Sequence, residues 1–298
     1  MRQDVYEKIT AQIIAELEKG VRPWHKPWDA GHVAGPISRP LRGNGKPYSG
    51  INVVMLWATA MQRGFCAPIW MTYRQAAELG AHVRKGEKGT LVVYASKISR
   101  TEADENGDEI EREIPFLKGY SVFNVEQIEG LPAHFTATHP PRLNEEQRIE
   151  KAEAFFAATG ADIRYGGNSA YYVPSQDFVQ MPPFESFRDA TAFCATLGHE
   201  QVHWTSHPKR LNRDFGGKRF GDQAYAMEEC VAEIGAAFLC ADLGLVPQIR
   251  EDHAPYVAGW LDCLKQDKRA IFTAASHAQR AVDFLHSLQE SQEEEAAA

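Results

Sequence analysis

The chain has 298 residues, of which 44% are hydrophobic. This length and composition allow two domains of ordinary size or one large one, with a buried core. The longest apolar runs fall far below the ~20 residues that span a bilayer, and the first residues lack the basic start and apolar block of a signal peptide, so we expect a cytoplasmic protein with no membrane partner. The five cysteines form no CxxC pair, which is typical of free thiols in a reducing compartment.

Charge is unevenly distributed along the chain, although the net charge of the whole is −8. Residues 1–100 carry 15 Lys and Arg against 7 Asp and Glu, a balance of +8, and the other 198 residues carry 17 against 33, a balance of −16. Such a difference between two parts of one chain indicates that the first part meets an anionic partner and the second does not.

The first part of the chain predicts a mixture of helices and strands. Val5, Ile9, Ile13 and Leu17 recur every four residues, so residues 1–19 are expected to form an amphipathic helix. Residues 21–49 are rich in Pro, Gly, Trp and basic residues and indicate a structured loop. The further expected elements are helices at 51–64 and 72–80, a strand at 89–100, an exposed hairpin tip or flexible loop at 101–113, and a returning strand at 117–130.

A Pro-containing segment at 138–144 is typical of a linker, and it separates a domain at 1–137 from a domain at 145–298. The second domain predicts a helix at 145–159, short strands around 162–165, 170–173 and 177–181, and helices near 186–205, 223–243, 254–265 and 268–289. The acidic tail at 289–298 is expected to be frayed or disordered. The fold class is α+β: an N-terminal α+β domain followed by a mainly helical domain with a small antiparallel sheet.

Aromatic and basic residues are interleaved in residues 22–50, and a second basic segment follows at 71–89. Bases of single-stranded DNA can stack on exposed rings while cations follow the phosphates, whereas duplex DNA hides its base faces, so the pattern favours single-stranded DNA as the partner. The alternative is that buried Trp rings hold the loop in place and that the cations form a solvated face. The candidate DNA-binding residues are Trp24, Lys26, Trp28, Arg39, Arg42, Lys46, Tyr48, Tyr73, Arg74, Arg84, Lys85 and Lys88.

The segment ATLGHEQVHWTSH, residues 195–207, contains the pattern His-Glu-x-x-His. On a helix, His199 and His203 lie one turn apart on one face, which is the spacing at which two imidazoles bind one zinc ion. Glu200 lies about 100° around the helix and is the candidate catalytic base that takes a proton from a metal-bound water. Small side chains on the side of the histidines leave room for a metal and a substrate. The alternative is an ordinary hydrogen-bonded His pair in the core.

A catalytic zinc site needs a third protein ligand, and the Pro after His207 argues against that histidine because it ends the helix. The helical stretch 222–244 carries Glu228, Glu229 and Glu233. Glu229 and Glu233 share one face, which resembles the gluzincin arrangement, so we assign Glu229 as the third ligand and Glu233 as the group that orients a ligand histidine. Glu228 is expected to be solvated or at the rim of the site. Three acids on an exposed face would be the alternative, but the helix is otherwise apolar. Zinc is the expected metal, with manganese as the alternative.

Two neighbouring segments have less specific patterns. Residues 169–183 are typical of an edge strand that ends at a Pro pair, and such a strand either pairs with an extended peptide substrate or serves only as scaffold. The basic run at 207–220 either guides an anionic partner past the site or forms a solvated loop.

Taken together, these features resemble the ArdC family of plasmid antirestriction proteins over nearly the whole chain. The segments PWHKPW, NGKPYSGINVVML and GAHVRKGEKGT carry the resemblance on the N-terminal side, which is also similar to the N-terminal part of plasmid-transferred DNA primases. LGHEQVHWTSHPKRLNR and YAMEECVAEIGAAFLCADLG carry it on the C-terminal side. The resemblance implies a single-stranded-DNA-binding domain joined to a zincin-type metallopeptidase domain, and a role in shielding incoming conjugative DNA from host restriction endonucleases.

Three functions stay open at this point. The first is an antirestriction protein that binds single-stranded DNA. The second is a DNA-tethered metalloprotease that cleaves DNA-bound or host regulatory proteins, and the third is a binding module whose metal is only structural. Because a protein that coats a strand can block an endonuclease without any chemistry, the sequence leaves open whether protection requires proteolysis.

Overall fold

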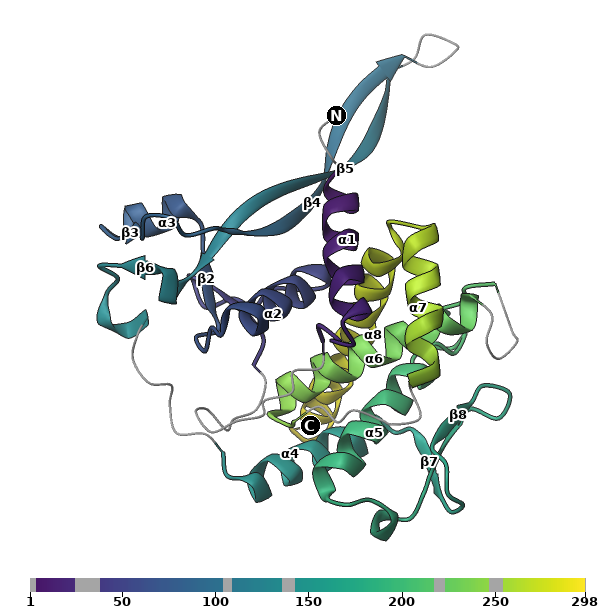
Figure 1. The fold of residues 1–298 in the computed structure, drawn as a ribbon. Helices are drawn as coiled ribbons and strands as arrows, with labels where there is room; N and C mark the ends of the chain where they lie inside the picture. Colours follow the sequence, from purple (N-terminus) through teal and green to yellow (C-terminus); the bar gives the residue numbers. More distant parts are fainter. Residues whose placement is uncertain are drawn as a thin grey trace.

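Figure 1 shows the computed structural model of the protein, which describes residues 4–24, 38–103, 109–135, 143–216, 223–246 and 254–297. The predicted α+β class is confirmed, and the predicted helices are found with ends shifted by a few residues. The returning strand begins at residue 109 rather than 117, and four short strands of the N-terminal half were not predicted as separate elements. The elements of the N-terminal half are α1 (Val5–Glu18), β1 (Leu41–Arg42), α2 (Ile51–Arg63), β2 (Ile69–Met71), α3 (Tyr73–Glu78), β3 (His82–Val83), β4 (Thr90–Ala103), β5 (Glu109–Asn124) and β6 (Ile128–Glu129).

Local signals explain where these helices begin and end. The side chain of Asp4 caps α1 by accepting a hydrogen bond from the backbone N–H of Tyr6 at 3.1 Å. Thr72 and Gln75 form a reciprocal capping box at the start of α3. Gly64 ends α2 with a φ of 71°, a left-handed conformation that glycine adopts at little cost.

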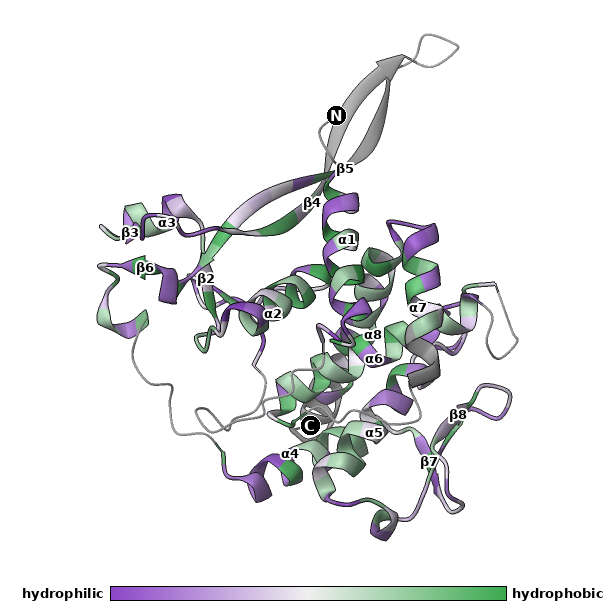
Figure 2. Ribbon diagram, viewed as in Figure 1, coloured by the Kyte–Doolittle hydropathy of each residue, from purple (hydrophilic) through white to green (hydrophobic). Residues whose placement is uncertain are grey.

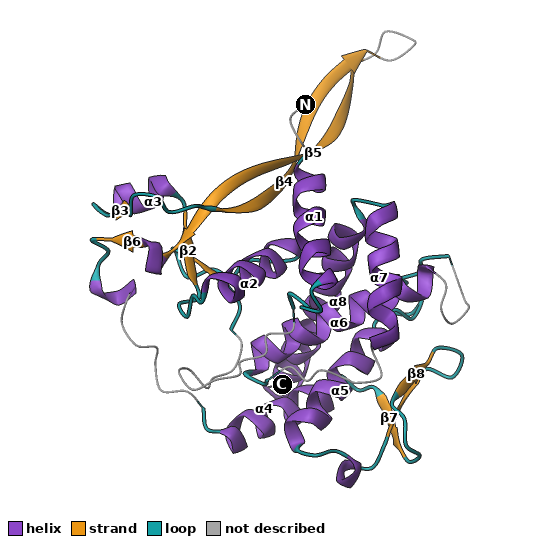
Figure 3. Cartoon of the chain, viewed as in Figure 1, coloured by secondary structure: helices purple, strands orange, loops and turns teal. Residues whose placement is uncertain are grey.

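A long antiparallel hairpin dominates the N-terminal sheet. Strands β4 and β5 pair from Thr90 opposite Val122 to Ala103 opposite Glu109, and the strand order is β1-β2-β5-β4. Figure 3 shows the hairpin running from the region of β2 past the N-terminal end of α1 and beyond the helices. The predicted tip at 101–113 is too long, because residues 101–103 belong to β4 and residues 109–113 to β5; residues 104–108 lie outside the described residues.

The C-terminal half is mainly helical, and α5 lies at its centre, in contact with α4, α6, β8 and β9. The small sheet has the order β7-β9-β8, with β7 parallel to β9 and β8 antiparallel to it. The elements are α4 (Glu145–Ala158), β7 (Asp162–Tyr165), β8 (Tyr171–Val173), β9 (Phe178–Met181), α5 (Ala190–Trp204), α6 (Gln223–Leu243), α7 (Ala254–Gln266) and α8 (Ala270–Ala297).

The structure corrects three sequence predictions in this half. The small sheet is mixed rather than antiparallel, because β7 pairs in parallel with β9. Residues 169–183 are not one edge strand, because a turn around Asp177 divides them into β8 at the edge and β9 in the centre of the sheet. The acidic tail is helical rather than frayed, since α8 continues to Ala297.

One hydrophobic cluster contains side chains from both halves of the chain. Trp24 meets Trp260 edge-on with ring centroids 5.7 Å apart, and Trp57 of α2 meets Phe238 of α6 at the same distance. Figure 2 shows apolar colours along α5 and α6, which lie in this core. A smaller cluster that includes Met71 supports the region of α3, β3 and β6. The predicted domain boundary remains a prediction, and residues 138–142 of the predicted linker lie outside the described residues.

All five cysteines are free thiols, as their spacing predicts. Within the described ranges, the helices are too short or too polar to cross a membrane. The cytoplasmic location remains a prediction.

Candidate metal centre

Helices α5 and α6 approach closely enough to bring three ligand side chains together. Gly235 of α6 faces Val202 of α5, and a Cβ atom at position 235 would lie only 2.8 Å from the Val202 side chain, closer than real Cβ atoms come. The glycine therefore permits a helix separation that a larger residue would increase. On the same helix, Glu229 reaches His199 and His203 of α5.

The ligand atoms of these three side chains converge. The two Nε2 atoms lie 3.2 Å apart, Nε2 of His203 lies 3.4 Å from Oε1 of Glu229, and Nε2 of His199 lies 3.6 Å from Oε2 of Glu229. In a tetrahedral zinc site, bonds of about 2.0–2.1 Å place the ligand atoms roughly 3.3–3.4 Å from one another. The spacing of the two Nε2 atoms is close to one edge of such a tetrahedron, and each imidazole faces a different oxygen of the Glu229 carboxylate at a similar distance. Two imidazoles with one carboxylate are a donor set that fits a divalent metal.

Two further carboxylates lie behind the histidines. Nδ1 of His199 is 3.8 Å from Oε1 of Glu233, the residue that the sequence assigns to orienting a ligand histidine. Nδ1 of His203 is 3.0 Å from Oε1 of Glu228. Because a carboxylate only accepts, His203 donates through Nδ1 and directs its Nε2 atom toward His199 and Glu229. Glu228 is therefore part of the site, which corrects the prediction of a solvated or rim residue.

Arg213, a residue of the basic run at 207–220, holds Glu228 in place. Its Nε atom donates to Oε2 of Glu228 at 2.7 Å and one terminal nitrogen donates to Oε1 at 2.6 Å. The same guanidinium donates to the carbonyl of Val202 at 2.8 Å and to the hydroxyl of Thr205 at 3.1 Å. Through the bidentate pair and these two bonds, Arg213 ties the second turn of α6 to the C-terminal end of α5. The basic run at 207–220 contains Arg213, but the sequence does not reveal that Glu228 is its partner.

Arg210, the other arginine of the described basic run, is also structural, whereas Lys209 is exposed. Arg210 forms an ion pair with Asp177, donates to the carbonyl of Trp204 at 2.6 Å and places its guanidinium 3.8 Å from the centre of the Trp204 ring. Neither expectation for the run, a guide for an anionic partner or a solvated loop, fits Arg210 and Arg213; residues 217–220 lie outside the described residues. His207 lies 3.9 Å from Asp177 and takes no part in the ligand cluster, as the following Pro predicts.

The ligands form a strongly coupled set of charges. Burial by itself lowers the pKa of His203, but the Glu229 and Glu228 carboxylates outweigh burial and raise that pKa to about 10. Burial raises the pKa of Glu229, yet the two histidines hold it well below its usual range. The chain alone therefore favours a protonated His203 between two carboxylates, and a bound cation would replace that proton.

Glu200, the candidate catalytic base, follows His199 on α5 and is 3% exposed. Its side chain is therefore in the interior rather than in bulk solvent. The catalytic role itself remains a prediction.

Three residues predicted to bind single-stranded DNA are held inside the protein. Trp24 is 0% exposed and Tyr48 is 4% exposed, so neither ring offers a face on which a base could stack. Arg39 donates to both carboxylate oxygens of Asp242 at 2.9 Å. For these three residues the structure favours the alternative interpretation, in which they fasten the loop to the body of the protein.

The other described candidates are exposed to solvent. We call the residues Tyr73, Arg74, Arg84, Lys85 and Lys88 the α3–β3 surface, because they lie in or beside these two elements. Tyr73 is 61% exposed. Arg42 and Lys46 are exposed beside β1, and Lys26 and Trp28 lie outside the described residues. The structure thus separates the candidates into a buried group and an exposed group.

Comparison with known proteins identifies the class of the C-terminal half. Residues 150–277 match the family described as zincin-like metallopeptidase, and this range contains all three clustered ligands. The helices and small sheet of this half therefore form a zincin-like metallopeptidase fold.

The remaining comparisons identify the family. Residues 3–123 match the N-terminal domain of anti-restriction factor ArdC. The metal-free crystal structure of the antirestriction ArdC protein from R388 plasmid has a TM-score of 0.81 and 48% identity, covering 97% of this chain and 99% of that one. Its Mn(II)-bound structure has a TM-score of 0.79 and 46% identity, covering 96% and 98%. The chain belongs to the ArdC antirestriction family.

Two curated relatives extend the comparison. Protein y4eC of Sinorhizobium fredii is 48% identical, over 96% of this chain and 92% of its own length. A DNA primase TraC of Escherichia coli is 38% identical over 99% of this chain, but the chain spans only 28% of that primase.

Proposed function

We propose that this protein binds single-stranded DNA through its N-terminal half, carries a divalent-metal peptidase centre in its C-terminal half, and protects incoming conjugative DNA from host restriction endonucleases. The family supports the antirestriction role. The observation that carries the catalytic part is the convergence of His199, His203 and Glu229 at separations of 3.2, 3.4 and 3.6 Å.

The side chains of this centre would divide the work. His199, His203 and Glu229 would hold zinc or, as the Mn(II)-bound structure of the R388 protein supports, manganese. A metal bound there supplies a Lewis acid that lowers the pKa of a coordinated water toward neutrality. Glu200 would accept a proton from the attacking water and pass it to the leaving amine. Glu228 and Glu233 would keep the two imidazoles oriented.

The α3–β3 surface is our candidate for the DNA contact. Tyr73 offers an exposed ring for base stacking, and Lys85 and Lys88 are exposed cations that can follow phosphates. Arg84 pairs with Glu87 at 3.0 Å, so part of the basic charge is already balanced within this surface. Binding should weaken steeply with salt, because each phosphate contact releases a counterion.

A second candidate function is a DNA-tethered peptidase that cleaves DNA-bound or host regulatory proteins. The observation that favours it is the site itself. A metal that only stabilises the fold requires ligands and no nearby acid. This site has in addition a buried acid, Glu200, directly after the candidate ligand His199 in the sequence. Binding of DNA alone can block an endonuclease and does not require a peptidase site. The site is therefore better explained by a protein substrate.

The two candidates are separated by comparing Glu200→Gln with His199→Ala. Each variant is assayed for metal content, single-stranded-DNA affinity, antirestriction activity in conjugation, and cleavage of a DNA-binding protein with and without DNA. We expect Glu200→Gln to keep metal and DNA binding and to abolish cleavage, and His199→Ala to lose metal.

The antirestriction activity of Glu200→Gln then shows whether protection of DNA requires proteolysis. If Glu200→Gln still protects DNA, coating of the strand suffices; if it does not, protection requires proteolysis. If no cleavage is detected with the native protein and His199→Ala unfolds the C-terminal half, the metal is structural and the peptidase proposal is wrong.

A further inference from the structure

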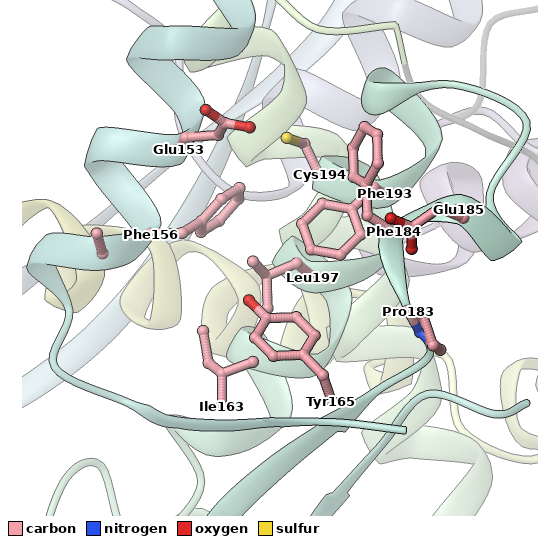
Figure 4. Close-up of a pocket in the computed structure, with 11 residues that line it drawn as sticks. Glu153, Phe156, Ile163, Tyr165, Pro183, Phe184, Glu185, Phe193, Cys194 and Leu197 are labelled. Atoms are coloured by element: carbon pink, nitrogen blue, oxygen red, sulfur yellow. The ribbon is translucent and has the colours of Figure 1, made fainter. Parts of the chain in front are cut away.

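A cavity of about 530 Å³ lies beside α5. Figure 4 shows that its walls come from α4, β7, α5 and the short 3-10 helix η3 (Phe184–Ser186). Leu197 in this cavity lies roughly 160° around α5 from His199, because successive helical residues turn by about 100°. The cavity therefore opens on the other side of the helix from the metal ligands, and the catalytic roles proposed above leave it unexplained.

The lining of the cavity is mainly aromatic and apolar. Phe156, Phe193 and Leu197 form its inner part, and Tyr165 and Phe184 are at its mouth. The two mouth residues are 61% and 47% exposed, which is unusual for large apolar rings. The Tyr165 ring is nearly parallel to that of Phe193, with centroids 6.4 Å apart. Exposed rings around a concave apolar site are typical of a surface that takes up an apolar group.

The charged groups of the cavity are both carboxylates. Glu153 of α4 and Glu185 of η3 stand on different walls, and no Lys or Arg lines the cavity. Across the described part of the chain, neither carboxylate forms an ion pair with a basic side chain. The cavity therefore favours an apolar group that has positive charges beside it and disfavours a phosphate.

An open strand edge lies next to the cavity. Strand β7 pairs with β9 on one side, and in the described structure its other side has no partner strand. Ile163 and Tyr165, two residues apart on β7, both line the cavity, as the alternation of side chains along a strand requires. An extended peptide that added to this edge would place alternate side chains over the cavity.

We propose that the cavity and the free edge of β7 form a recognition site for an extended protein segment that presents a large apolar side chain between basic residues. The apolar side chain enters among Phe156, Phe193 and Leu197, the peptide backbone pairs with β7, and the flanking cations meet Glu153 and Glu185. The proposal deepens the peptidase function by naming the kind of segment that the protein holds. It rests on that function only for the cleavage of the bound segment, and the binding itself is independent of it.

Direct binding tests the proposal. The probe is a fluorescein-labelled peptide of alternating threonine and lysine with one central phenylalanine. Its binding to the full chain is followed by fluorescence anisotropy in the presence of a metal chelator, so that no cleavage occurs.

Ala157→Trp fills the cavity from the exposed face of α4, and we expect it to weaken binding at least about tenfold, because the aromatic side chain of the probe loses its buried place. Ala154→Trp, exposed on the same helix but outside the cavity, is the matched control and should bind like the native protein.

Charge and backbone pairing are tested separately. The double variant Glu153→Gln/Glu185→Gln should weaken binding about threefold to tenfold at low salt, whereas Glu146→Gln/Glu150→Gln, which removes the same charge elsewhere on α4, should not. A probe with glutamate in place of lysine, and one whose backbone amides are methylated, should both bind poorly.

Each contrary result overturns the proposal. The proposal is wrong if the native protein does not bind the lysine probe, or if Ala157→Trp and Ala154→Trp bind it equally well. It is also wrong if the glutamate or methylated probe binds as tightly as the lysine probe, or if Ala157→Trp loses binding to an oligonucleotide and keeps binding to the peptide. These experiments measure only binding, so the two proposals can fail separately. If the protein binds the probe but cleaves no substrate, the recognition site stands and the peptidase function is wrong.

Discussion

The metal centre and the α3–β3 surface present their functional candidates in opposite ways. At the metal centre, His203 is fixed by Glu228, which is fixed in turn by Arg213, and each of these side chains is largely buried. On the α3–β3 surface, Tyr73 and Lys85 extend into solvent. A buried network specifies geometry, which a metal needs, whereas exposed rings and cations adapt to a flexible strand.

The same comparison explains why the predicted DNA residues divide into two groups. Trp24 and Tyr73 are both aromatic residues near cations in the sequence, yet one is 0% and the other 61% exposed. Composition does not tell the two roles apart, because burial depends on packing with distant parts of the chain.

The largest expected effect is on the metal. His199→Ala removes one of three protein ligands, so we expect metal affinity to fall at least about a hundredfold, more than the loss of an orienting group costs. Glu228→Gln, which keeps all three ligands but weakens the hydrogen bond to Nδ1 of His203 and removes the ion pair with Arg213, should cost about tenfold. Titration calorimetry measures both affinities. Unchanged single-stranded-DNA affinity in both variants is the control; a parallel loss of DNA binding would mean that the two regions are not independent.

Next in size is a matched pair of aromatic substitutions. Trp24→Ala should lower the free energy of unfolding by about 3–5 kcal/mol, because a buried ring leaves a cavity against Trp260. Tyr73→Ala should leave stability within about 0.5 kcal/mol and weaken single-stranded-DNA binding about tenfold, the loss of one stacked base. Chemical denaturation and anisotropy with a labelled oligonucleotide provide the two measurements. The contrast fails if folded Trp24→Ala binds DNA less tightly than Tyr73→Ala does.

A smaller effect tests the contact between α5 and α6. Gly235→Ala should cost about 1–3 kcal/mol of stability and also weaken metal binding, because the new Cβ pushes α6 and its Glu229 away from α5. Val202→Ala in the same chain should restore part of the metal affinity, since it removes the atoms that the Cβ would meet at 2.8 Å. Metal affinity of the double variant no better than that of Gly235→Ala would show that the helix separation does not control the site.

The smallest effect concerns pH. Hydrogen bonding to Arg210 holds the pKa of Asp177 below its ordinary value of 3.8. Because the folded-state pKa is lower than the unfolded one, the ion pair stabilises the fold fully above pH 3.8, and that contribution is lost as the pH falls through the folded-state value.

Asp177→Asn isolates this ion pair, and asparagine tolerates the φ of 56° at this position. We expect the variant to be about 1 kcal/mol less stable at neutral pH, a modest figure because the pair is partly exposed, and the difference should disappear in acid. Urea denaturation across the pH range measures it. A difference that persists unchanged at low pH would rule out the ion pair as its source.

Much of the metal centre could be predicted because its signals are local. The spacing of His199 and His203 identifies one helix face, and Glu229 is assigned as the third ligand because Glu233 shares its face four residues on; the structure brings these three candidate ligands together. Glu228 was misjudged because its partners, His203 and Arg213, lie outside its own helix. The relative position of α5 and α6 depends on Gly235 meeting Val202, a contact that no pattern in either helix reveals.

The shared core limits how the protein can be divided. Trp24 and Trp57 of the N-terminal half bury their rings against Trp260 and Phe238 of the C-terminal half. Cutting the chain between the two halves would expose these rings to water, so we expect neither fragment to be stable and soluble by itself. A chain truncated after its first half should then lose the proposed DNA binding together with the proposed peptidase activity.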